Sequence, residues 1–509
     1  MSASLSDPTL SRLAHSVLWP GFQGLNAPTW LMHALERGLA GAVYFEQNLD
    51  PEDSSQVQAL SARIHGSRSG ALIGVDEEGG VVTRLQARHG SHSPGNAVLG
   101  RVDDVSLTEQ SAAYIGALVR GAGIDINLAP TVDVNSNPRN PVIGVRSFGT
   151  DPELVARHAA AYVRGIQQSG IAACPKHFPG HGDTETDSHL DPATANVSLE
   201  ELYAVHLAPF KAAIDAGARA MMSAHIRVPA LGDAPATLNR TTLGIARELG
   251  FDGVLITDAI DMAAVSQTVG LGQGAVDALA AGADLVCIGN PGAGASDARE
   301  RRDEADFLTP LHAIYGALKS GELSVERVEE AVARTAALSA WIEQQNAASA
   351  APRAATIFDG AAIAARAAMT IGDVRLAATD VTVIDARTKR SIAVGDAADF
   401  FTVAIRETLD ARERPLTRIA LAGLSAGEAS ARVQQVIAAG PGEVVLLINQ
   451  PQSSAFEAAV LSATLTARAD AVVVWAGWPS EEPVPATRAL FTYGASRATA
   501  VHAARALAG

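Results

Sequence analysis

Eight short apolar runs alternate with longer helical patterns in the first part of the chain, and each run is bounded by Gly, Pro or Asp. The runs cover residues 15–19, 41–45, 71–76, 123–128, 171–175, 218–224, 253–258 and 284–289. Near-continuous apolar runs are typical of parallel strands that are covered on both faces. The helical patterns between them include residues 152–168, 199–216, 241–249 and 270–281. Eight strands that alternate with helices predict an α/β fold, a (β/α)₈ TIM-type barrel.

A second pattern begins after a helix expected at residues 324–345, which runs into an Ala/Ser/Pro-rich stretch typical of a linker. Beyond it, strands are expected near residues 381–384, 418–423, 443–449 and 471–476. This pattern predicts a smaller open α/β sandwich domain. We therefore expect a barrel domain over residues 1–346, a linker over 347–360 and a second α/β domain over 361–509.

The composition excludes several classes of protein. Hydrophobic residues make up 48% and charged residues 18% of the 509 residues, which is ordinary for a chain with a large core and excludes disorder, coiled coil and collagen. The formal net charge of −16 repels a phosphate backbone, and aromatic residues are only 5%, so no nucleic-acid partner is expected.

The location of the protein is predicted from its cysteines and its apolar stretches. Cys174 and Cys287 lie inside apolar runs, which favours reduced core thiols of a cytosolic protein. The N-terminal stretch carries Asp7 and no basic region before an apolar segment, unlike a secretory signal. Since no window of about 18 apolar residues lacks a charge, no membrane partner is expected and the protein is predicted to be cytoplasmic.

Polar residues gather where these strands are expected to end. Asp76 closes the third run and is followed by Arg84, and Arg146 lies in the loop NPVIGVRSFG after the fourth run. Residues 176–189, after the fifth run, hold three of the thirteen histidines, and their glycines and proline favour a loop. Asp258 ends the seventh run. Because the active site of a barrel enzyme lies at the carboxyl ends of the strands, these residues are candidates for function.

Two chemistries fit the histidine-rich loop. Acid/base catalysis would pair Asp187 with His189, two residues apart, so that the carboxylate holds the imidazole in one tautomer, and would take a carboxylate nucleophile from another strand. Metal-dependent hydrolysis is disfavoured, because H-x₃-H-x₇-H matches no standard zinc pattern and the glycines are a poor scaffold for ligands. Its ligands would be His177, His181, His189, Asp183 and Asp187.

These residues also have structural interpretations. Asp258 could cap the following helix, and Asp187 with His189 could form a solvated surface pair. Asp133 and His225 also lie near strand ends, and we expect both to be structural.

Four motifs give the chain a family resemblance. The segments GVDEEGGVVTRL, NPVIGVRSFG, KHFPGHGDTETDSH and GVLITDAIDM occur in this order and resemble glycoside hydrolase family 3, in its β-N-acetylglucosaminidase branch of NagZ-type enzymes. The resemblance covers roughly residues 10–345, and the third motif is long and highly specific. One departure is Glu77, where many relatives have Gln.

The resemblance implies a retaining exo-β-N-acetylglucosaminidase that acts on muropeptide- or chitin-type oligosaccharides without cofactor or metal. Asp258 would be the nucleophile of a covalent glycosyl-enzyme intermediate, and His189 the acid/base with Asp187 as its partner. The hydroxyls of the terminal sugar would be held by Asp76, Arg84, Arg146, Lys176 and His177.

Other functions stay open at this point. A neutral imidazole base does not repel an anionic acceptor, so a phosphorylase that uses inorganic phosphate and releases N-acetylglucosamine 1-phosphate is an alternative. A mixed glucosidase/N-acetylglucosaminidase is another. Because the barrel loop already carries the acid/base, residues 355–509 are expected to be accessory, as a wall of the cleft or a packing partner. The sequence does not give the oligomeric state.

Overall fold

The computed structural model describes residues 5–185, 193–289, 302–348, 358–377, 380–388, 400–410, 416–421, 423–440, 442–479 and 485–509. The chain forms two compact units. The barrel unit consists of Met1–Glu78, Thr108–Ser136 and Thr150–Ile357. The α/β unit consists of Gly79–Leu107, Asn137–Gly149 and Phe358–Gly509.

Each of the eight apolar runs overlaps a strand, and every residue of these strands is buried. The strands are β1 (Leu18–Pro20), β2 (Gly41–Tyr44), β3 (Leu72–Val75), β4 (Ile126–Asn127), β5 (Ala172–Ala173), β6 (Ala220–Ser223), β7 (Val254–Thr257) and β8 (Val286–Ile288). Parallel pairing joins β2-β3-β4-β5, β6-β7 and β1-β8, and β1 contacts β2. Single parallel bridges, Phe178 to Ser223 and Ile256 to Leu285, connect the remaining neighbours. The ring is closed, which confirms the predicted barrel.

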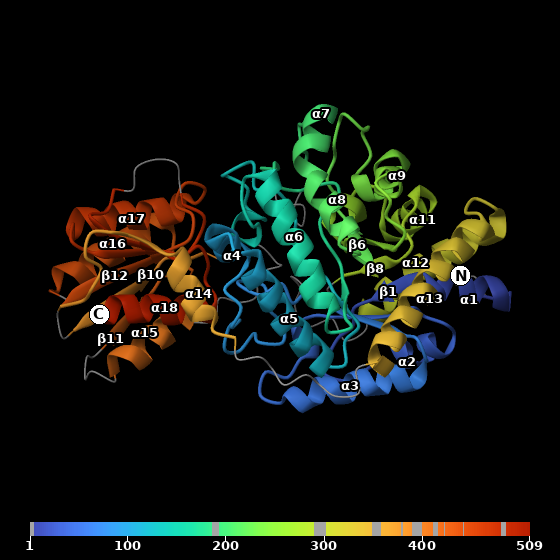
Figure 1. The fold of residues 1–509 in the computed structure, drawn as a ribbon, viewed down its shortest axis with the longest axis horizontal. Coiled ribbons are helices and arrows are strands. Elements are labelled where there is room, and N and C mark those ends of the chain that lie inside the picture. The colour runs from blue at the N-terminus through green and yellow to red at the C-terminus, as the bar shows by residue number, and fades with distance from the viewer. Residues whose placement is uncertain are drawn as a thin grey trace. The chain divides into compact units, whose positions relative to one another are not determined.

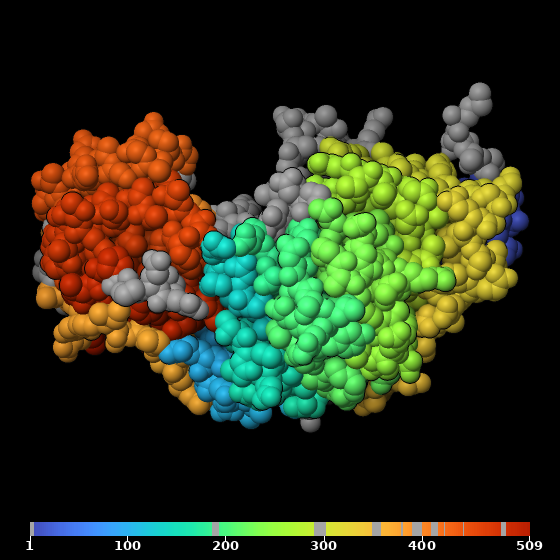
Figure 2. All heavy atoms as spheres, turned by 90° about the horizontal axis from the view of Figure 1, so that it is seen from above, coloured from blue at the N-terminus to red at the C-terminus, as the bar shows by residue number. Residues whose placement is uncertain are grey.

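Helices surround these strands (Figure 1). The longer ones are α1 (Pro8–Ser16), α2 (Thr29–Glu36), α3 (Ser54–Ser67), α5 (Val105–Gly121), α6 (Pro152–Gln167), α8 (Ala208–Asp215), α9 (Arg240–Glu248), α11 (Leu271–Ala281), α12 (Arg302–Ser320) and α13 (Val325–Ala348). Short turns are η1 (Glu46–Asn48), α7 (Leu199–Glu201), η3 (Leu202–His206), η4 (Ala236–Leu238) and α10 (Ala263–Ser266). Helix α1 packs against α12, and Figure 2 shows blue N-terminal atoms beside the yellow surface of α12.

Two local predictions are wrong. His15 was expected to begin the first strand but lies in α1, which is nucleated by Asp7, whose side chain accepts from the backbone N–H groups of Thr9 and Leu10. The single helix expected at residues 199–216 is interrupted by the π-turn η3, and α8 restarts with Pro209 in its first turn. Proline has no N–H to donate to the preceding turn, which breaks the regular α-helical ladder.

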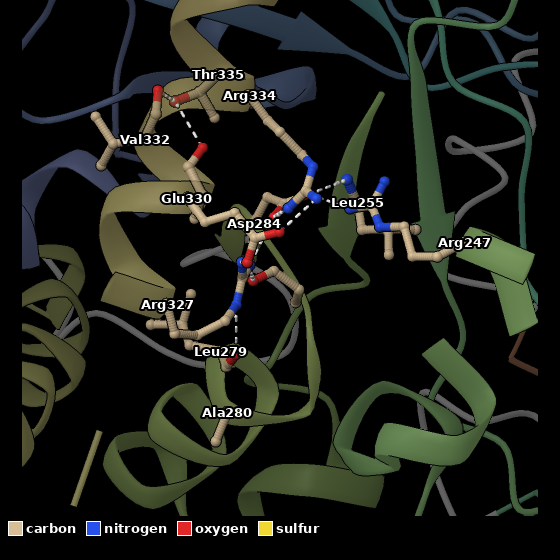
Figure 3. Close-up of polar contacts among 12 residues, drawn as sticks. Arg247, Leu255, Leu279, Ala280, Asp284, Arg327, Glu330, Val332, Arg334 and Thr335 are labelled. Atoms are coloured by element: carbon tan, nitrogen blue, oxygen red, sulfur yellow. Dashed lines mark hydrogen bonds and ion pairs between the residues drawn. The ribbon is translucent and has the colours of Figure 1, made fainter. Parts of the chain in front are cut away.

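A buried carboxylate holds α13, the last helix of the barrel unit, against the amino end of the barrel (Figure 3). Asp284, just before β8, accepts from Nη2 of Arg247 and Nη2 of Arg327, both at 2.6 Å, and from Nη1 of Arg334 at 3.1 Å. It also accepts from the backbone N–H of Leu255 in β7. Helices α9 and α13 are thereby tied to two neighbouring strands.

The α/β unit contains a six-stranded sheet in the order β11-β10-β12-β13-β14-β9. The five strands other than β9 are parallel, and β9 pairs antiparallel at one edge. The strands are β9 (Met369–Ile371), β10 (Val381–Asp385), β11 (Leu416–Ala420), β12 (Glu443–Ile448), β13 (Val472–Trp475) and β14 (Arg488–Phe491). The four predicted strands of this domain are confirmed. The other two, β9 and β14, were not predicted, since one is exposed and the other begins with Arg488.

Helices cover both faces of this sheet. Helices α15 (Phe400–Asp410) and α18 (Arg497–Ala508) lie on one face, and α16 (Ala426–Ala438) and α17 (Ala455–Ala467) lie on the other (Figure 1). Among the described residues, no helix is long and apolar enough to cross a bilayer.

Two segments from the first third of the chain belong to the α/β unit. They carry α4 (Asn96–Val102), which contacts α14 (Gly360–Ala367), and the short turn η2 (Gly144–Arg146). A Cβ placed on Gly360 would lie only 1.9 Å from the carbonyl oxygen of His92, so the two backbones are in close contact. The α/β unit is therefore not one continuous stretch of chain, whereas the sequence predicts two continuous domains. The predicted domain limits at residues 346 and 361 stay predictions.

Candidate active site

Lys176 forms the centre of a charged cluster at the carboxyl ends of β3 and β5. Its Nζ lies 2.5 Å from Oδ1 of Asp76 and 2.8 Å from Oε1 of Glu78. Thr131 donates a hydrogen bond to the other oxygen of Glu78. Lys176 and Glu78 are each 3% exposed, whereas the side chain of Asp76 is 19% exposed. The ammonium is therefore fixed by two carboxylates, and Asp76 is the member of the cluster that is most open to a ligand.

Glu78 is a residue that sequence reasoning missed. It lies two positions after Asp76 in the same motif, on the same side of an extended chain. That spacing was the available signal. Its backbone carbonyl also accepts from the hydroxyl of Tyr162, so this end of β3 is held from the α6 side as well.

Asp133 holds the segment that carries His177 and His181. Its carboxylate accepts from Nδ1 of His177 at 2.7 Å and from the backbone N–H of His181 at 2.6 Å. Asp133 is fully buried; burial acts to raise its pKa, but the two neighbouring histidines outweigh burial and its pKa lies below the ordinary value. We expected Asp133 to be merely structural, yet it orients His177 directly. The bond from Nδ1 to Asp133 therefore fixes the orientation of the His177 ring.

The glycines of the histidine-rich loop allow it to pack against the chain after β4. A Cβ on Gly182 would lie 1.6 Å from the carbonyl oxygen of Val134, so no side chain fits there. Thr184 bonds Nδ1 of His181 at 2.7 Å. Asp187 and His189 lie outside the described residues, and their proposed pairing stays a prediction. After them, Ala193 and Ala195 exchange backbone hydrogen bonds with Arg227 beyond β6.

Asp258 lies directly after β7, where its backbone N–H donates to the carbonyl of Ser223 in β6. One carboxylate oxygen accepts from the N–H of Ala259 at 2.8 Å. The following helix, α10, begins only at Ala263, and Met262 is its N-cap. The helix-cap interpretation of Asp258 is therefore wrong. Its half-buried carboxylate is held by its own strand end and is not used to start a helix.

His225 supports the same strand end from β6. Its Nε2 lies 2.9 Å from the carbonyl oxygen of Ala259, and its Nδ1 lies 3.0 Å from the hydroxyl of Thr237. The ring is 1% exposed, which agrees with the structural role expected from the sequence.

Arg84 and Arg146 lie in the α/β unit, whereas Asp76, Lys176, His177 and Asp258 lie in the barrel unit. Both arginines are buried, at 7% and 4% exposure. The strand-end residues Asp76 and Lys176 are brought together as expected, and His177 adjoins Lys176 in the chain.

The metal-dependent alternative includes Asp187 and His189 as ligands, and both lie outside the described residues. Among the residues that the structure describes, no group of three or more His, Cys, Asp or Glu side chains could hold a metal ion. Asp133, which lies beside His177 and His181, already accepts three hydrogen bonds from them. Cys174 and Cys287 are buried free thiols, and burial raises the pKa of each well above the ordinary value, so neither is a nucleophile at neutral pH.

A closed (β/α)₈ barrel with paired charges at the carboxyl ends of its strands has the architecture of a barrel enzyme. A sequence model of the Glycosyl hydrolase family 3 N terminal domain matches residues 30–338. This match covers more than half of the chain, and the chain therefore belongs to glycoside hydrolase family 3. The family resemblance and the class of enzyme expected from the motifs are confirmed.

Several known proteins are similar to this chain. Beta-hexosaminidase A of Pseudoalteromonas piscicida is 32% identical over 334 residues, which are 61% of this chain and 54% of that protein, so the match spans about half of that relative. Beta-hexosaminidase of Stenotrophomonas maltophilia (strain R551-3) is 39% identical over 295 residues, 56% of this chain and 82% of that protein. The structure of a glycoside hydrolase family 3 beta-N-acetylglucosaminidase from Paenibacillus sp. str. FPU-7 has a TM-score of 0.83 and 32% identity, and the match covers 98% of this chain and 96% of that one.

Proposed function

We propose that the protein is a retaining exo-β-N-acetylglucosaminidase that releases terminal β-linked N-acetylglucosamine from oligosaccharides. The observation that carries this proposal is the position of Asp258, a half-buried carboxylate at the carboxyl end of β7 that caps no helix. The names of the hexosaminidase relatives and of the Paenibacillus enzyme support the choice of sugar.

The reaction takes place in two steps. A carboxylate oxygen of Asp258 attacks the anomeric carbon while His189, oriented by Asp187, gives its proton to the departing glycosidic oxygen. The neutral His189 then removes a proton from water, whose oxygen attacks the same carbon and releases Asp258. Two inversions leave the sugar with its original anomeric configuration.

The charged cluster provides the contacts for the sugar. The Asp76 carboxylate accepts from a hydroxyl, while Lys176, fixed between Asp76 and Glu78, donates to a neighbouring one. His177 is held in register by Asp133. We further propose Arg84 and Arg146 as sugar-binding residues, and muropeptide- or chitin-type fragments met in the cytoplasm as substrates.

The first test is product analysis on an aryl β-N-acetylglucosaminide, with and without millimolar inorganic phosphate. Free N-acetylglucosamine at an unchanged rate is expected in both cases. A phosphate-dependent rate with the sugar 1-phosphate as main product would instead assign a phosphorylase. No turnover in either condition would contradict the proposed activity.

The second test is Asp258→Asn, which keeps the shape of the side chain and removes the nucleophile. Turnover is expected to fall by at least about 10³-fold, because the covalent step has no substitute. Asp261→Asn is a matched control three residues away, because the Asp261 side chain accepts from the backbone N–H groups of Gly289 and of Asp261 itself, and an amide oxygen can accept the bond from Gly289 in its place. Equal losses in both variants would contradict the assignment of Asp258.

The third test is His189→Ala on two leaving groups. An aryl leaving group needs little protonation, so activity on it is expected to fall far less than activity on a disaccharide. Equal losses on both substrates would argue against a proton-donating role for His189.

A further inference from the structure

The loop that carries Arg146 is held firmly within the α/β unit. The side-chain oxygen of Asn140 accepts from the backbone N–H groups of Val142 and Ile143 at 2.9 and 2.8 Å, and η2 follows. From α4, Asn96 donates its side-chain amide to the carbonyl of Arg146 at 2.7 Å. These buried amides fix one side of the loop.

The other side of this loop is covered by Gln450. Gln450 follows β12 at its carboxyl end and is 5% exposed. A Cβ placed on Gly144 would lie 3.0 Å from Nε2 of Gln450, so the amide lies directly over Gly144, two residues before Arg146. Gly144 has a φ of +45°, a conformation that side chains rarely adopt. The turn and the amide are thus fitted to each other without an intervening side chain.

A buried glutamate fixes Gln450 in turn. Glu457 of α17 is 0% exposed, and its Oε2 accepts from the backbone N–H groups of Asn449 and Gln450 at 2.7 and 2.8 Å. Its Oε1 accepts from the hydroxyl of Thr388, after β10, at 2.9 Å. One carboxylate therefore connects the ends of two adjacent strands and sets the direction in which Gln450 leaves β12.

The location of this connection in the sheet is informative. Taken in chain order from β10, the five parallel strands lie in the order 2-1-3-4-5, so the connections reverse direction between β10 and β12. In open α/β sheets this reversal is where ligands usually bind. Here the carboxylate of Glu457 lies at the reversal point and accepts hydrogen bonds from backbone N–H groups. Gln450 extends from this point to the Arg146 loop.

We propose that Gln450, oriented by Glu457, is a positioning residue that sets the conformation of the Arg146 loop for sugar binding. Residues of the α/β unit then have a defined role in substrate affinity beyond the accessory packing expected from the sequence. This inference rests on the proposed function, in which Arg146 contacts a hydroxyl of the terminal sugar.

The experiment uses the full chain and an aryl β-N-acetylglucosaminide. Gln450→Ala is expected to raise KM about fivefold and to change kcat less than about twofold, because a contact made in both ground and transition states affects KM alone. Gln450→Met keeps the side-chain volume without the amide, and the same rise is expected. Gln452→Ala is the matched control in the same turn, since Gln452 donates to the carbonyl of Trp478 instead. The control is expected to keep the KM of the parent enzyme.

A double variant separates positioning from general structure. If Gln450 acts through Arg146, the KM of Arg146→Ala/Gln450→Ala equals that of Arg146→Ala alone. A double variant whose rise in KM equals the product of the two single rises would overturn the positioning proposal. An unchanged KM in both Gln450 variants, while Arg146→Ala raises KM, would overturn it too. Both outcomes leave the proposed sugar contact of Arg146 intact. An unchanged KM in Arg146→Ala would overturn the sugar contact itself, and with it the positioning proposal.

Discussion

Asp284→Asn tests how much the amino end of the barrel depends on one buried charge. The Asp284 side chain is 0% exposed, and the arginines that surround it, Arg247, Arg327 and Arg334, are only 13–25% exposed (Figure 3). Asparagine has the same shape as aspartate but carries no charge. Asp284→Asn therefore breaks all three ion pairs at this position while the packing of β8 stays the same.

The expected loss of unfolding free energy depends on the partners that the three arginines keep in this variant. Arg327 and Arg334 keep Glu330, at 2.6 and 2.5 Å. Arg247 keeps two backbone carbonyls but loses its carboxylate. Removing one partner of a buried ion pair typically costs about 3–5 kcal/mol. The retained partners place the expected loss near the lower limit, about 3 kcal/mol, which corresponds to a fall in Tm of roughly 3–5 °C for a unit of this size.

The assay is equilibrium unfolding in urea, followed by tryptophan fluorescence and far-UV circular dichroism. Glu330→Gln is the matched control, because it removes a carboxylate from two of these arginines, Arg327 and Arg334, but its side chain is 51% exposed. An exposed pair contributes less than about 1 kcal/mol. If Asp284→Asn loses no more stability than Glu330→Gln, the reasoning from burial is refuted.

Two further predictions concern histidines of the barrel unit. Burial acts to lower the pKa of His65, but its hydrogen bond to Asp125 and the charge of that carboxylate outweigh burial and raise the pKa above the ordinary value. The pair therefore stabilises the fold fully below the ordinary pKa of 6.5 and loses this effect as pH rises through the raised value, so the Tm difference between the parent and His65→Gln should shrink from acid to alkaline pH. A constant difference across that pH range would contradict the pairing. Asp133→Asn should lower kcat/KM by roughly 10–100-fold through loss of the charge-assisted bond to His177, with thermal melting measured in parallel; an unchanged kcat/KM would show that His177 needs no such support.

The barrel was predictable from the sequence because its strands are buried on both faces. Such strands appear as uninterrupted apolar runs, and each of the eight runs overlaps one. The first and last residues of the strands were less predictable, since β4 and β5 are only two residues long and lie inside longer apolar runs. In the α/β unit, β9 was missed because its three residues are exposed and its only strand partner is β14.

The candidate site was predictable only in part. The strand-end rule placed Asp76 and Lys176 together, although they are 100 residues apart in the chain. It gave no weight to Glu78 and Asp133, since the partner of each comes from a different strand and depends on how the strands pair. The assignment of Arg84 and Arg146 to the α/β unit depends on packing between distant segments, which no local pattern reveals.

The two ends of the barrel handle buried charge in opposite ways. At the amino end both oxygens of Asp284 are occupied by arginines from helices, and such saturation favours stability. At the carboxyl end Lys176 is shared between two carboxylates, and one of them, on Asp76, is partly exposed. A cluster with an exposed acceptor can exchange water for a ligand hydroxyl without moving its charges. The central carboxylate at the amino end is therefore fully enclosed, whereas the carboxylate of Asp76 is partly exposed at the end where Asp258 also lies.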